Sequence, residues 1–196
     1  LNTTSLNLSG CISLTTLDLS KFTKLTSLDV SGCTALTTLD LSKCTALTTL
    51  DAGNSGITTL DFTACTNITD ISVANCTALT EINASGCTSL TELVLASATN
   101  LTSLDVSNCT ALTNLDISTL VNLEVFQACS AGITMLSNDS TCLNFSYNPK
   151  LKEIYVNDLT SFTEINLTAN TELEKFIYDL MPMTTIDLSN CVSLQN

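Results

Sequence analysis

The sequence predicts a β-solenoid of short parallel strands with little or no helix, and three observations support this prediction. A Leu-Thr-x-Leu-Asp motif returns every eleven residues, as in LTTLDLSKFTK at 14–24, LTSLDVSGCTA at 25–35 and LTTLDLSKCTA at 36–46. Apolar and polar residues alternate within each motif, which is the period of a strand with one buried face. Self-similarity at a short fixed period is typical of a solenoid, and eleven residues are too few for a strand, a helix and two turns.

The second leucine of each motif, or the residue in its place, marks eighteen units along the chain. Most markers are eleven residues apart, three spacings are ten and one, between 136 and 143, is seven. Residues 1–196 therefore read as a single solenoid with an irregular coil or loop at 137–142. The markers are Leu6, Leu17, Leu28, Leu39, Leu50, Leu60, Ile71, Ile82, Leu93, Leu104, Leu115, Phe126, Leu136, Leu143, Ile154, Ile165, Phe176 and Ile186.

Alternate units differ in kind, which indicates that one coil of the solenoid contains two units. The residue after the marker is always Asp, Asn or Gln in the even units but varies in the odd ones. We therefore expect about nine coils of 21–22 residues, two strands in each coil, and a weakly curved body. In the even-numbered units, the position four residues after this polar residue should point inward and stack from coil to coil. These positions should form one structural ladder, made of Cys44, Cys65, Cys87, Cys109, Asn148, Asn170 and Cys191.

The even units carry the pattern LxxLxLxxN/CxL, as in LTTLDLSKCTAL at 36–47 and FTEINLTANTEL at 162–173. In this pattern the chain resembles the leucine-rich repeat proteins. Its nested half-period is similar to that of the bacterial IRREKO-like subclass, and the internalin-like surface proteins are related. The resemblance implies a leucine-rich repeat solenoid with a binding role, located outside the cell or on a bacterial surface. Cysteine in place of asparagine at most ladder positions departs from the family pattern.

Composition argues against several classes of function. The net charge is −13 with only six lysines, whereas a nucleic-acid-binding protein needs a basic stripe. No apolar run is long enough to cross a bilayer, so we expect no membrane insertion. The chain has no histidine to activate a nucleophile, and we expect neither catalysis nor a cofactor. Both termini look truncated or lack caps, and a monomer or an end-to-end contact with an adjoining domain is expected.

The ten cysteines fit free buried thiols better than disulfides, because most occupy the same slot in successive coils. A buried thiol behaves as a small apolar group with a weak donor. Cys129 and Cys142 lie off the ladder, and a disulfide between them stays open. Neither a histidine nor a C-x-x-C motif is present, so no metal site is predicted.

Two polar rows admit more than one interpretation. The carboxylates of Asp18, Asp40 and Asp61 should stack, either as a solvated row that bonds strand ends or water, or as a weak Ca²⁺ site. Threonine follows the first leucine of most units, either to support strand entry and bond the turn backbone, or to form an ice-binding face.

Candidate ligand-binding residues gather in the last third of the chain. Seven of the nine aromatic residues lie between Phe126 and Tyr178. The outward positions of two neighbouring strands become Glu153, Tyr155, Lys175 and Ile177 there, a mixture suited to recognition of a protein or a glycan. The alternative is that these coils pack on a cap or neighbouring domain. We predict a non-catalytic protein- or glycan-binding module of a bacterial surface or secreted protein; a structural spacer without a ligand is the second hypothesis.

Overall fold

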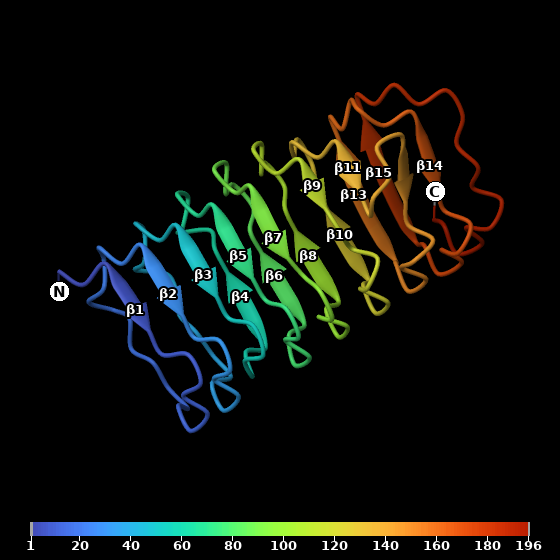
Figure 1. Cartoon of the computed structure of the whole chain (residues 1–196). Helices are drawn as coiled ribbons and strands as arrows, with labels where there is room; N and C mark the ends of the chain where they lie inside the picture. The colour runs from blue at the N-terminus through green and yellow to red at the C-terminus, as the bar shows by residue number, and fades with distance from the viewer. Residues whose placement is uncertain (1, 196) are drawn as a thin grey trace.

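The computed structural model describes residues 2–195 as an elongated stack of coils that runs from β1 at one end to β15 at the other (Figure 1). No helix occurs in this part of the chain. The strands are β1 (Ser5–Asn7), β2 (Ser27–Asp29), β3 (Thr49–Asp51), β4 (Thr59–Asp61), β5 (Asp70–Ser72), β6 (Glu81–Asn83), β7 (Glu92–Val94), β8 (Ser103–Asp105), β9 (Asn114–Leu115), β10 (Val125–Gln127), β11 (Met135–Leu136), β12 (Cys142–Asn144), β13 (Glu153–Asn157), β14 (Glu164–Asn166) and β15 (Lys175–Asp179).

The strands form two faces around one apolar interior. Face A holds the sheet β1-β2-β3-β5-β7, followed by the pairs β9–β11 and β12–β14. Face B holds the continuous sheet β4-β6-β8-β10-β13-β15. All of these strand pairs are parallel, and marker residues lie opposite one another, as Leu28 and Leu50 do. The predicted solenoid of short parallel strands, with two strands in a typical coil, is therefore confirmed.

The regular alternation of the two faces ends after Phe126. Strand β10 pairs with β13, so Phe126 lies opposite Ile154, 28 residues further along the chain. Strands β11 and β12 both lie on face A within this one long coil, and residues 137–141 turn the chain between them. The structure consequently has about eight coils rather than nine, because Leu136 and Leu143 share a coil.

The long coil also corrects the predicted ladder, because there are two ladders instead of one. After the strands of face B, the Sγ of Cys65 lies 3.5 Å from the carbonyl oxygen of Cys44, and the Sγ of Cys109 lies 3.1 Å from that of Ala84. After the strands of face A, the Nδ2 of Asn148 donates to the carbonyl oxygens of Ile117 and Leu120. We call these ladder B and ladder A. Ladder B contains Cys44, Cys65, Cys87 and Cys109; ladder A contains Cys33, Ser55, Cys76, Ala98, Leu120, Asn148, Asn170 and Cys191.

Glycine lies in the turn of two of the three ten-residue units, within the segments SGIT and AGIT. The N–H of Gly56 donates to the carbonyl of Cys33, and the N–H of Gly132 donates to the carbonyl of Cys109. A Cβ atom on Gly132 would lie 2.1 Å from the carbonyl oxygen of Thr110, and one on Gly56 would lie 2.3 Å from that of Thr34. A turn that lacks one residue therefore brings two backbones into contact, and only glycine fits there.

Threonine hydroxyls tie successive coils together. The Oγ1 of Thr48 donates to the carbonyl oxygen of Thr26 at 2.8 Å, and the Oγ1 of Thr69 donates to that of Thr48 at 3.0 Å. The same bond recurs on face B, where Thr102 donates to Thr80 at 3.0 Å. Each of these hydroxyls has one O–H donor, and that donor is bonded to a backbone carbonyl of the protein. This favours the structural interpretation of the threonine rows.

All ten cysteines lie within the described residues and are free thiols. Seven are buried, two (Cys129 and Cys142) are half-buried and Cys11 is exposed. Burial raises the pKa of Cys65 and Cys109 to about 12 and that of Cys87 to about 11. Ladder thiols are therefore protonated donors to backbone carbonyls, and they are poor nucleophiles at neutral pH.

We expect iodoacetamide to modify Cys11 readily in the native protein and Cys129 and Cys142 more slowly, since the thiolate is the reactive form. Intact-protein mass spectrometry should show at most three adducts natively and ten after unfolding in urea. Native modification of Cys65 or Cys109, located by peptide mapping, would show that ladder B opens in solution.

Candidate binding surfaces

Four residues predicted to bind a partner lie together on face B near the C-terminal end. Strand β13 provides Glu153 and Tyr155, and strand β15 provides Lys175 and Ile177. The strands pair in register, so that Glu153 lies opposite Lys175 and Tyr155 opposite Ile177. Alternate side chains of a strand point to the same side, and these four therefore share the outer surface. We call this group the terminal patch.

The side chains of the terminal patch are held by contacts among themselves. The Tyr155 hydroxyl donates to the Glu153 carboxylate, and the Nζ of Lys175 lies 4.9 Å from the centroid of the Tyr155 ring. Its interaction with Tyr155 raises the pKa of Lys175, and the charge of Glu153 adds to the effect. Tyr155 is half-buried, while Ile177 is 39% exposed. The patch thus presents an aliphatic side chain beside an oriented aromatic ring and two side chains of opposite charge, Glu153 and Lys175.

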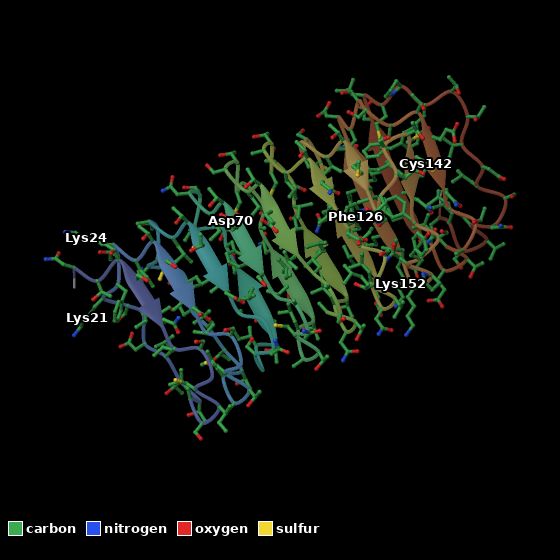
Figure 2. All side chains as sticks on the ribbon, viewed as in Figure 1. Lys21, Lys24, Asp70, Phe126, Cys142 and Lys152 are labelled. Atoms are coloured by element: carbon green, nitrogen blue, oxygen red, sulfur yellow. The ribbon has the colours of Figure 1, made fainter. Side chains whose placement is uncertain are left out.

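A charged row next to the terminal patch was not found from the sequence. Threonine at the entry of the face B strands gives way, after Thr102, to Glu124, Lys152 and Glu174. The Nζ of Lys152 lies 2.8 Å from the Oε2 of Glu124, and Lys152 projects from the edge of its coil (Figure 2). Both side chains are 39% exposed, so this ion pair contributes about 0–1 kcal/mol to stability.

Most of the clustered aromatic residues fill the interior instead of the surface. Phe126, Phe145 and Phe162 are fully buried, and the rings of Phe126 and Phe145 meet edge to face with centroids 5.6 Å apart. Tyr147 and Tyr178 are exposed. The aromatic cluster as a whole is therefore not a recognition surface, because its phenylalanines pack in or against the apolar core.

The carboxylate rows bond the turns that follow the strands. The Oδ1 atoms of Asp18, Asp40 and Asp61 each accept the backbone N–H of the residue two positions later, at 2.9 Å. Asn83 and Asn144 accept the equivalent bond, which explains why Asp and Asn exchange freely at this position. Within residues 2–195 no three or more acidic, cysteine or histidine side chains form a group that could hold a metal ion. The carboxylates thus belong to Asx turns, which supports the interpretation that this row bonds the strand ends.

Stability should fall in acid because these hydrogen bonds are stronger to an ionised carboxylate than to a protonated one. Hydrogen bonds from the hydroxyl and the N–H of Ser42 hold the pKa of Asp40 below its ordinary value of 3.8. A lowered folded-state pKa stabilises the protein above pH 3.8, and the contribution disappears as the pH falls through the folded value. We expect Asp40→Ala to lower the melting temperature at pH 7, and Asp40→Asn to keep it and to reduce the acid-induced loss. Equal melting temperatures for wild type and Asp40→Ala would contradict the turn assignment.

The coil geometry and the Leu-rich motif define a leucine-rich repeat solenoid. The profile of the leucine-rich repeat domain of endo-beta-N-acetylglucosaminidase EndoS matches residues 19–132. The chain belongs to this family. A comparison with curated proteins gives no match. The described residues contain no helix long and apolar enough to cross a membrane.

Solved structures with a similar fold come from several bacteria. The functional domain of InlJ from Listeria monocytogenes, described as including a cysteine ladder, is 22% identical with a TM-score of 0.35; the match covers 97% of this chain and 47% of that one. Internalin InlF from Listeria monocytogenes is 18% identical with a TM-score of 0.38, over 90% and 61% of the two chains. The repeat protein LIC12759 of Leptospira interrogans is 14% identical with a TM-score of 0.33, over 97% and 88%. The chain thus spans about half the length of the InlJ domain and three fifths of InlF.

Proposed function

We propose that this chain is a non-catalytic binding module that docks a protein partner on the terminal patch. The supporting observation is the grouping of Glu153, Tyr155, Lys175 and Ile177 on adjacent strands, with the tyrosine ring fixed by its neighbours. An oriented aromatic ring beside an exposed aliphatic chain loses little conformational freedom on binding, and such residues dominate protein interfaces. We place the module outside the cell or on a bacterial surface.

A catalytic role has no chemical support in the described residues. The chain has no histidine, and the thiols of ladder B have raised pKa values. The carboxylates of Asp18, Asp40 and Asp61 stand in equivalent turns, whereas general acid–base chemistry needs two groups in unlike environments. The family description names an endo-beta-N-acetylglucosaminidase, in which the repeat domain is one part of a larger enzyme. We propose that any glycan-related role of this chain is recognition.

A capture experiment separates a binding module from a spacer. The purified chain and the variant Tyr155→Ala/Ile177→Asp are immobilised and exposed to a mixture of extracellular proteins, and bound proteins are quantified by mass spectrometry. Ser103→Ala, on the outer side of β8, is the control. We expect one or a few proteins to be retained by wild type and control and lost by the double variant. No specific capture would favour the spacer hypothesis, and equal specific capture by all three would show that the partner binds away from the terminal patch, provided that circular dichroism shows the variants folded.

A further inference from the structure

The sheet of face A is broken between β7 and β9. In the step before the break, the carbonyl of Thr69 accepts the N–H groups of Thr91 and Glu92 and the hydroxyl of Thr91. The carbonyl of Thr91 accepts no corresponding bond from Thr113 or Asn114, although β7 and β9 still contact one another. The pattern resumes one step later, where Thr134 and Met135 donate to the carbonyl of Thr113.

The break exposes backbone donors and acceptors that a regular coil would pair. Among residues 2–195 the N–H of Leu95 finds no backbone carbonyl, whereas its counterpart in the previous coil, Val73, donates to Val94 at 3.0 Å. Leu93 is 7% exposed, compared with 1–2% for Leu28, Leu50 and Ile71 on the same face. Two strand edges with alternating N–H and C=O groups therefore face each other and are open to the solvent side.

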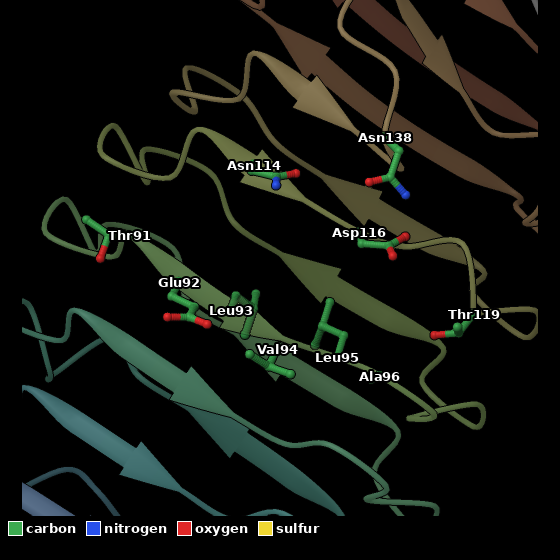
Figure 3. A pocket seen from close by; sticks show the side chains of 10 residues that line it. All are labelled: Thr91, Glu92, Leu93, Val94, Leu95, Ala96, Asn114, Asp116, Thr119 and Asn138. Atoms are coloured by element: carbon green, nitrogen blue, oxygen red, sulfur yellow. The ribbon is translucent and has the colours of Figure 1, made fainter.

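Polar side chains without partners surround this opening (Figure 3). A groove of about 640 Å³ lies there, lined on β7 by Glu92 and Val94 and on β9 and the following turn by Asn114, Asp116 and Thr119. Asn138 completes the lining from the turn after β11. The side chains of Glu92, Asn114 and Asn138 take part in no hydrogen bond within residues 2–195, unlike Asp116, whose Oδ1 accepts the N–H of Ser118. Such a volume is within the usual range of small-ligand sites.

The composition of the groove selects among ligand classes. A peptide strand inserted between β7 and β9 would need about 4.8 Å on each side of it. Because β7 and β9 remain in contact with each other, there is no room for such a strand between them. Two of the three unpartnered side chains are neutral amides and the third is Glu92, while the other carboxylate, Asp116, accepts the N–H of Ser118. A mainly neutral set of free groups favours a neutral ligand over a cation. A hydroxyl group both donates and accepts, so it suits strand edges that offer both kinds of group as well as amide and carboxylate side chains. Val94 offers an apolar surface for the C–H face of a sugar ring.

We propose that the groove between β7 and β9 binds an uncharged, hydroxyl-rich ligand, namely an oligosaccharide. Ring hydroxyls would bond Asn114 and Asn138 and the free backbone groups at the break, and the Glu92 carboxylate would accept from a pair of adjacent hydroxyls. The site lies on face A and the terminal patch on face B, so the two sites are separate and this proposal does not depend on the protein partner.

Titration of neutral oligosaccharides by isothermal calorimetry tests the site. The probes are the β-1,4-linked trimer of N-acetylglucosamine, maltotriose and a free N-linked glycan released from a glycoprotein. Two lost neutral hydrogen bonds should weaken binding about tenfold or more, which we expect for Asn114→Ala/Asn138→Ala. Glu92→Gln should weaken it less. The controls are Glu81→Gln, a strand carboxylate on the unbroken sheet of face B, and Thr49→Ala, on an unbroken step of face A. Both should bind as wild type does.

Several outcomes would overturn the proposal. These are the absence of binding by every probe at millimolar concentration, unchanged affinity in the Asn114→Ala/Asn138→Ala variant with its fold intact, and a requirement for a lysine-rich peptide with affinity that falls steeply with salt. Comparing the affinity for the free N-linked glycan with the affinity for the intact glycoprotein that carries it shows whether the groove binds the sugar as a free oligosaccharide or attached to a protein. Tyr155→Ala/Ile177→Asp should keep oligosaccharide binding while losing the protein partner, so failure of either proposal is seen independently.

Discussion

Phe126→Ala should lower the free energy of unfolding by about 3–5 kcal/mol, the usual cost of removing a buried phenylalanine. Phe126 is fully buried between the two faces, on the last strand before the long coil (Figure 2). Its ring meets Phe145 edge to face, with an angle of 61° between the ring planes. Truncation leaves a cavity that the hydrogen-bonded strands β8 and β13 on either side cannot collapse into.

Phe126→Leu is the informative comparison for this prediction. The equivalent residues on β6 and β8 are Ile82 and Leu104, so a consensus argument treats the change as neutral. The structure predicts a loss of about 1–2 kcal/mol, because leucine is smaller than the fully buried ring and gives up its contact with Phe145. Urea unfolding followed by far-ultraviolet circular dichroism measures both variants, with Leu104→Ala as a core control. A neutral Phe126→Leu would show that the contact with Phe145 does not contribute to stability.

The fold could be predicted because the period of the sequence and the geometry of a strand agree in nearly every unit. Leucine at the marker, a polar residue on either side and a turn of four residues leave one way to bury the apolar side chains. The inward slot held by Cys65 and Cys109 could also be recognised, since a thiol can replace an amide as donor to the turn. Each of these features is local and repeats.

The assignment of the repeat units to the two faces is wrong after residue 136, where the spacing of the repeat becomes irregular. The sequence predicts an irregular coil or loop at 137–142, but the strict alternation of units still assigns Leu136 and Leu143 to unlike halves of a coil. In the structure both residues lie on face A, so every later unit changes face relative to the count. The strand that pairs with β10 is fixed by contacts 28 residues apart, and an alternation pattern contains no information about them. Asn148 and Asn170 were therefore placed in the wrong ladder.

The two candidate sites differ in how far the sequence could reveal them. Glu153, Tyr155, Lys175 and Ile177 stand out because polar outward positions become aromatic and aliphatic. The groove beside Asn114 and Asn138 was missed, because the motif around residue 113 is the same as in paired coils. A broken sheet arises from how coils stack, and only the absence of a bond between Thr91 and Thr113 reveals it.

Asn148→Ala should destabilise the protein by about 2–3 kcal/mol, because two buried carbonyls lose their donor. The Nδ2 of Asn148 lies 2.9 Å from the carbonyl oxygen of Ile117 and 3.0 Å from that of Leu120, and the side chain is fully buried. These bonds join the long coil to the coil before it across 28 and 31 residues of chain. The Oδ1 of Asn148 accepts no protein hydrogen bond, so its removal offsets part of the loss.

Asn148→Cys should cost less than Asn148→Ala, because cysteine serves as the donor at other positions of ladder A. The Sγ of Cys76 lies 2.9 Å from the carbonyl oxygen of Ala52, the same kind of contact. Urea unfolding gives the two losses, and hydrogen exchange followed by mass spectrometry shows where the protein opens. We expect faster exchange in residues 117–148 and little change before residue 100, since coils of a solenoid depend mainly on their neighbours. Equal losses for the two variants would mean that the slot is filled for volume alone, and that the amide hydrogen bonds of Asn148 do not hold the long coil in register.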